Sequence, residues 1–155
     1  MTITETIQTL LEADATLMAI LTGGIYTKEE VGELGMKNEN TVVSAAWTEV
    51  NEYPVLQPCL VVQARGFVLD GTRWDVESKT ASGRQAVVLW FYNDQSAGWT
   101  AIQNASNRCY QLLAMEPVAG AGILTPSILD DKRPAPELDN VNLLRAEYRS
   151  TRSIT

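Results

Sequence analysis

The run Gln85–Tyr92 constrains the fold of this chain more than any other segment. Its sequence, QAVVLWFY, is rich in β-branched and aromatic residues and predicts a strand. Both alternating sets of side chains along this strand are apolar, so both of its faces have to be covered. Any fold for this chain must therefore bury a strand on its two sides.

Two segments have the periodicity of amphipathic helices. In residues 3–21 apolar side chains recur at steps of three and four. Asp14 interrupts that apolar face, and we expect it to cap a second, short helix, because an aspartate accepts hydrogen bonds from free backbone amides. Gly23 and Gly24 then end the helical region. Another helix is expected over about 97–115, before Pro117.

Other segments alternate with a period of two and predict further strands. Residues 130–139, with Pro134 and Pro136, read as a loop, and residues 142–154 read as a half-exposed edge or face strand. The expected strands besides 85–92 are 25–26, 59–64, 123–129 and 142–154.

Two irregular stretches interrupt this order. Residues 27–57 read as a long excursion, with a capping box at Thr27–Glu30 and a short helical turn around 41–47. Residues 66–83 read as a long connection between two strands. The order of elements predicts an α+β fold in one domain, 1–155: a small, mostly antiparallel sheet with two helices packed on one face.

The composition excludes several kinds of chemistry. The chain has no histidine, which removes Ser-His-Asp and Cys-His catalysis, and its two cysteines, Cys59 and Cys109, are too few for a structural zinc site. Adjacent carboxylates such as Asp130 and Asp131 read as solvated surface. We therefore expect no enzyme activity, cofactor or metal. We also expect both thiols to be free, because no targeting or membrane-spanning segment is visible and a reducing cytoplasm is the expected place of synthesis.

The charge is unevenly distributed. Residues 1–52 hold nine acidic and two basic side chains, a net of −7, which is the net charge of the whole chain. Basic residues form no patch along the sequence; Arg145, Arg149 and Arg152 come closest. Tight binding to DNA needs clustered lysines and arginines, so we expect duplex DNA to bind weakly.

Apolar side chains in the irregular stretches are candidates for contacts with a partner. Residues 66–83 contain Phe67, Leu69, Arg73 and Trp74, and the excursion contains Trp47. Tryptophan is enriched at protein interfaces. Residues 66–83 are either an arm that orders on a neighbouring subunit or a hairpin extension that folds back on its own subunit. Trp47 either contacts a partner or packs back on the domain.

Several segments together resemble the tail terminator (tail completion) proteins of long-tailed bacteriophages. They are the opening LLEADATLMAILTGGIY, the strand QPCLVV, the run VLWFY followed by a helix with NRCYQLL, and the closing strand 143–152. The resemblance spans most of the chain. It depends on the order of helices and strands and not on catalytic residues. Residues 27–57 are its least similar part.

The resemblance implies a ring, expected to be a hexamer, at the head-proximal end of the tail tube in the virion, assembled in the host cytoplasm. Its implied partners are further copies of itself, the tail tube protein, a head–tail connector or stopper protein and, in a contractile particle, the tail sheath, with DNA passing through without tight binding. Two alternatives stay open: a head–tail connector or stopper protein, and a cytoplasmic tail assembly chaperone or adaptor.

Overall fold

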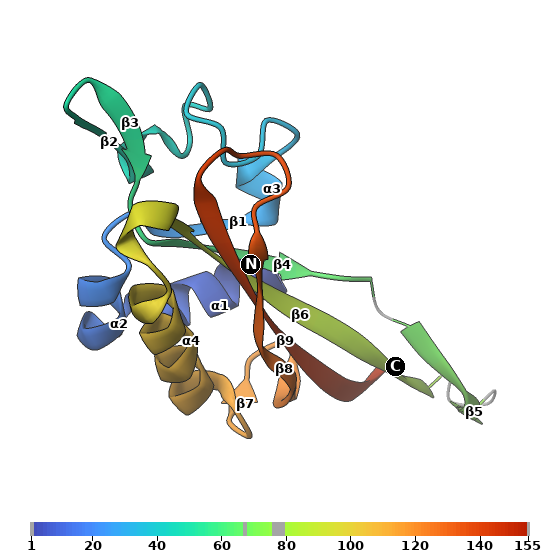
Figure 1. Cartoon of the computed structure of the whole chain (residues 1–155). Coiled ribbons are helices and arrows are strands. Elements are labelled where there is room, and N and C mark those ends of the chain that lie inside the picture. The colour runs from blue at the N-terminus through green and yellow to red at the C-terminus, as the bar shows by residue number, and fades with distance from the viewer. Residues whose placement is uncertain (1, 67, 76–79, 155) are drawn as a thin grey trace.

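The computed structural model describes residues 2–66, 68–75 and 80–154 and has the expected α+β fold (Figure 1). A curled, mostly antiparallel sheet carries α1, α2 and α4 together on one face (Figure 1). The helical elements are α1 (Ile3–Glu12), α2 (Ala15–Ile20), α3 (Lys28–Val31), η1 (Ser44–Ala46), η2 (Gln95–Ala97) and α4 (Thr100–Leu113). The strands are β1 (Gly24–Thr27), β2 (Trp47–Val50), β3 (Tyr53–Leu56), β4 (Cys59–Ala64), β5 (Val68–Asp75), β6 (Thr80–Asp94), β7 (Pro117–Val118), β8 (Gly122–Pro134) and β9 (Val141–Ile154).

Strand β6 is the centre of the sheet. The strands lie in the order β1-β4-β6-β9-β8-β7, and β5 also pairs with β6. The pair β1–β4 is parallel, whereas β4, β5 and β9 all run antiparallel to β6. The pairing of β6 with β9 is continuous from Ala81 opposite Ile154 to Asp94 opposite Val141. The longest strand of the chain thus joins the sheet along its whole length.

Both faces of β6 are covered, as the sequence predicts. On one face Val87, Leu89 and Phe91 are fully buried in a core that they form with α1, α2 and α4. On the other face Trp90 and Tyr92 pack on a second, smaller core. Residues of the 27–57 segment supply half of that second core: Val31, Met36, Val43, Ala46 and Leu56. The expected excursion is therefore the cover of the second sheet face.

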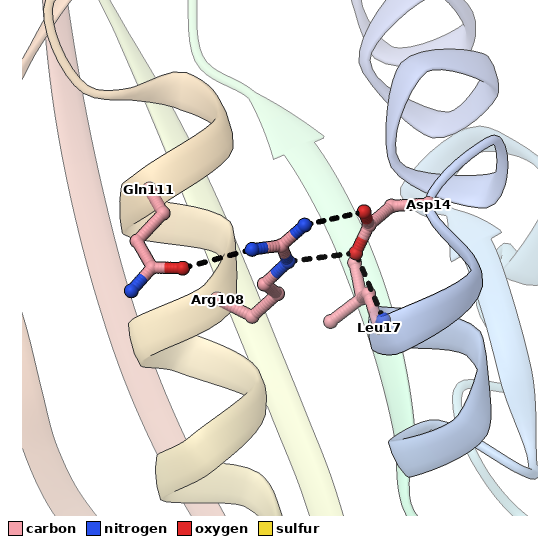
Figure 2. Close-up of polar contacts among 4 residues, drawn as sticks. All are labelled: Asp14, Leu17, Arg108 and Gln111. Atoms are coloured by element: carbon pink, nitrogen blue, oxygen red, sulfur yellow. Dashed lines mark hydrogen bonds and ion pairs between the residues drawn. The ribbon is translucent and has the colours of Figure 1, made fainter.

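An ion pair joins the N-terminal helices to α4 (Figure 2). Asp14 is the N-cap of α2, as expected, and its Oδ2 accepts from the backbone N–H of Leu17 at 2.9 Å. The Arg108 side chain donates to both carboxylate oxygens of Asp14, from Nε at 2.8 Å and from Nη2 at 2.7 Å, and Gln111 holds the guanidinium from the other side. The hydrogen bond with Arg108 lowers the pKa of Asp14 to about 2.

Three expectations about the later strands differ from the structure. Residues 141–150 of β9 lie between β6 and β8 and are mostly buried, whereas the sequence predicted a half-exposed edge or face strand; beyond Ser150 the strand pairs only with β6 among the described residues. Strand β8 continues through the first half of the expected 130–139 loop, as far as Pro134. Its pairing shifts register between Pro126 and Asp131, and such irregular positions accommodate prolines and short charged runs within a strand. Finally, β6 runs from Thr80 to Asp94 and extends beyond both ends of the expected strand 85–92.

Two hairpins occupy segments that the sequence presented as irregular. Strands β2 and β3 are joined by Asn51 and Glu52, both with positive φ, which is the geometry of a two-residue hairpin turn. Within 66–83, the described residues form β5 and the start of β6 and pair with each other. Together with the end of β9 they extend away from the body (Figure 1). We call β5, residues 80–86 of β6 and residues 149–154 of β9 the arm.

We predict that Gly23→Ala lowers the free energy of unfolding by about 1–3 kcal/mol, the usual cost of overpacking. A Cβ at Gly23 would lie 2.8 Å from the carbonyl oxygen of Gln57 and 2.9 Å from that of Pro58, where β1 approaches β4. Gly66→Ala is the matched control, because a Cβ there meets no atom within 4 Å. Urea unfolding of both variants measures the difference; equal midpoints would contradict the close approach.

We predict that Asp14→Asn is less stable than the wild type at neutral pH. Asparagine keeps an N-capping oxygen but loses the charge that Arg108 holds. Because the pKa of Asp14 is lowered to about 2 in the fold, its stabilising effect is present above its ordinary pKa and disappears as pH falls through about 2. Chemical unfolding at several pH values should show the two proteins converging at acid pH, while Glu12→Gln matches wild type throughout.

Candidate interaction surfaces

The two cysteine thiols, the most reactive side chains of the chain, are part of its hydrophobic cores. Cys59 and Cys109 are free and fully buried, as expected. Burial raises the pKa of both thiols, so they stay protonated at neutral pH and are poor nucleophiles. Each belongs to a hydrophobic core, Cys109 to the first and Cys59 to the second.

The adjacent carboxylates also have structural partners. Glu29 accepts from the Thr4 hydroxyl at 3.1 Å, and Glu30 accepts from the backbone N–H of Thr27 at 2.7 Å in the predicted capping box. Asp130 lies 3.7 Å from the Lys132 ammonium, and Asp131 pairs with Arg133 and Arg145. In the part of the chain that the structure describes, no group of three or more such side chains is placed to hold a metal ion. The described helices include none long and apolar enough to cross a membrane.

Three arginines lie close together on the second face of the sheet, next to the second hydrophobic core. The backbone N–H of Arg65 donates to the Ala86 carbonyl at 2.8 Å, and Arg149 is paired with Ala86 from the other side, so the two arginines flank β6. Arg84 lies two residues along β6, on the same face as Ala86. All three are exposed. We call Arg65, Arg84 and Arg149 the arginine face.

The arginine face has little negative charge beside it. Arg65 lies 4.0 Å from the carboxylate of Glu147, a buried residue of β9. No described residue forms an ion pair with Arg84 or Arg149. The sequence did not predict this cluster, since Arg65 follows β4, Arg84 lies in β6 and Arg149 lies in β9, far apart along the chain. Only the register of β4, β6 and β9 brings them together.

An acidic groove lies against the β2–β3 hairpin. It has a volume of about 760 Å³ and is bounded by residues 53–55, 94–96, 137–141 and the loop at 37–39. Four carboxylates, those of Glu39, Asp94, Glu137 and Asp139, line it together with a single lysine, Lys37. We call this the acidic groove. Tyr53 at its rim is 73% exposed, more than any other large hydrophobic side chain whose exposure the structure describes.

The candidate interface residues fall in different parts of the molecule. Trp47 lines the acidic groove and packs on its own chain: its ring lies against the second core and its Nε1 donates to the Met36 carbonyl at 3.1 Å. Leu69, Arg73 and Trp74 belong to β5, of which the backbone is described, with their side chains outside the described part. Phe67 lies outside the described residues. Strand β2, which begins at Trp47, and β5 are at opposite ends of the molecule (Figure 1).

The chain matches no protein-family model and no curated protein. Its fold is similar to that of a chain in a solved structure, the virion of a native gene transfer agent (GTA) particle. The TM-score is 0.54 at 14% sequence identity, and the match covers 94% of this chain and 90% of that one. At this identity the likeness shows the fold alone, and it includes nearly all of both chains.

Proposed function

We propose that this chain is a structural virion protein of a phage-like particle and acts as its tail terminator. The observation that carries the proposal is the likeness of fold, over 94% of the chain, to a chain of a gene transfer agent virion. The order of helices and strands that resembles tail terminators in the sequence supports the same assignment. The two cysteines are buried and the adjacent carboxylates have structural partners, which fits a protein that acts by binding other proteins.

In this proposal the chain forms a ring, expected to be hexameric, on the head-proximal end of the tail tube. A ring that binds the growing end of an open stack and presents a different far face ends polymerisation. Its other face then meets the head-side connector or stopper, and DNA passes through without being held. In a contractile particle the tail sheath is a further neighbour. The segment around Leu69, Arg73 and Trp74 is proposed to contact an adjacent protein.

Electron microscopy of the purified protein, alone and mixed with tail tubes of the same particle, tests this function. We expect rings, and rings at one end of each tube only. Tubes that polymerise with the protein present should be shorter than tubes that polymerise without it, since the cap blocks further addition. Rings that bind the head vertex and ignore the tubes would favour a connector or stopper. Absence from purified virions would favour an assembly chaperone.

The proposed contact through β5 makes a separate prediction. Trp74→Ala should weaken assembly while leaving the melting temperature of the monomer nearly unchanged, because an interface aromatic contributes mostly to binding. Tyr110→Ala, at an exposed aromatic of α4, is the matched control and should assemble normally. Size-exclusion chromatography with light scattering measures both variants. Normal assembly of Trp74→Ala would leave β5 as a hairpin extension of its own subunit.

A further inference from the structure

Among the described residues, the ion pairs made by arginine are unevenly distributed. Away from the arm, arginines are matched with carboxylates: Arg108 with Asp14, and Arg133 and Arg145 with Asp131. On the arginine face, Arg65 has only a distant partner and Arg84 and Arg149 have none among the described residues. These three exposed guanidinium groups repel one another on one surface. An external anionic surface would satisfy them.

The same chain has the complementary surface at its other end. The carboxylates of Glu39, Glu137 and Asp139 are exposed along the acidic groove, and no described residue forms an ion pair with any of them. The hairpin beside the groove adds Glu49 and Glu52, which are also exposed and have no ion pair with a described residue. The β2–β3 hairpin and the arm extend from opposite ends of the molecule (Figure 1). One copy therefore cannot bring its own two surfaces together.

We propose that the arginine face is a docking surface for a second copy of this chain, which presents its acidic groove. The contact joins two different surfaces, so it is heterologous, and repetition of such a contact closes into a ring when the rotation allows. The inference rests on the proposed ring and identifies the two surfaces that build it. Opposite charges on the two surfaces select this orientation, because two arginine faces or two acidic grooves repel.

The unpaired strand edges of the arm are a second reason to expect another copy of this chain on the arginine face. Among the described residues, β5 pairs only with β6, and β9 beyond Ser150 also pairs only with β6. The outer edges of these strands therefore have unpaired backbone groups next to the arginine face. Soluble proteins normally cover or pair such edges. A neighbouring copy seated on the arginine face would also cover an adjacent strand edge.

Charge reversal at the two surfaces tests the proposal. The first variant carries Arg84→Glu and Arg149→Glu, and the second carries Glu39→Arg and Glu137→Arg. Each alone should self-associate on the order of 100-fold more weakly than wild type, because like charges then face each other. Mixed in equal amounts they should assemble again, because the reversed surfaces complement one another. Native mass spectrometry and light scattering follow assembly, and circular dichroism confirms that each variant is folded.

The controls separate this inference from the proposed function. Glu12→Arg with Glu116→Arg changes the net charge as much as the second variant, at exposed sites away from the groove, and should assemble like wild type. Assembly of wild type should weaken as salt rises from about 0.1 to about 1 M, where the Debye length falls from about 10 to about 3 Å.

Folded charge-reversal variants that still form normal rings would overturn the docking surface and leave the terminator function standing. A wild-type protein that stays monomeric alone and with tail tubes would contradict both. If Arg84→Glu with Arg149→Glu assembles normally but abolishes binding to duplex DNA in a mobility-shift assay, the arginine face is a phosphate-binding surface and the proposal fails.

Discussion

Burial of β6 on both faces is the constraint on which the rest of this structure depends. A strand that is apolar on both sides is stable only when each side is removed from water. Helices α1, α2 and α4 cover one side, and the 27–57 segment covers the other. Since β4, β5 and β9 all pair directly with β6, the position of nearly every other element follows from this one strand.

The arm is the part of β6 and its neighbouring strands that extends beyond the two hydrophobic cores. Strand β6 is 15 residues long, and its buried aliphatic and aromatic positions lie toward its C-terminal half. In the N-terminal half, the exposed Arg84 lies on the sheet face where the C-terminal half has apolar residues. Arg65 and Arg149 lie on the same face, on either side of β6. The sheet face that extends from the body thus carries charge at these three positions. Such a face suits a contact between folded subunits, in which charge sets the orientation and the on-rate.

Much of the fold was predictable from local patterns. The N-cap at Asp14, the capping box at Thr27 and the strand Cys59–Ala64 were all confirmed, because each depends on residues adjacent in the chain. The β2–β3 hairpin was missed because its turn is Asn-Glu, whereas the usual signal for two positive φ angles includes a glycine. The burial of most of β9 was missed because alternating polar residues normally mark a solvated face. Glu147 is buried there despite its charge, and Arg65 lies beside it.

The sequence by itself determined the class of fold, the double burial of β6, the free cysteines and the lack of histidine-based chemistry. These properties depend on composition and on periodicity within short segments. Tertiary structure alone decided the arginine face and the acidic groove, because both are assembled from residues far apart in the chain. Strand register brings Arg65, Arg84 and Arg149 to one surface, and packing of the 27–57 segment brings Glu39 into the same groove as Glu137. Electrostatic interaction depends on separation in space, which the chain acquires only when it folds.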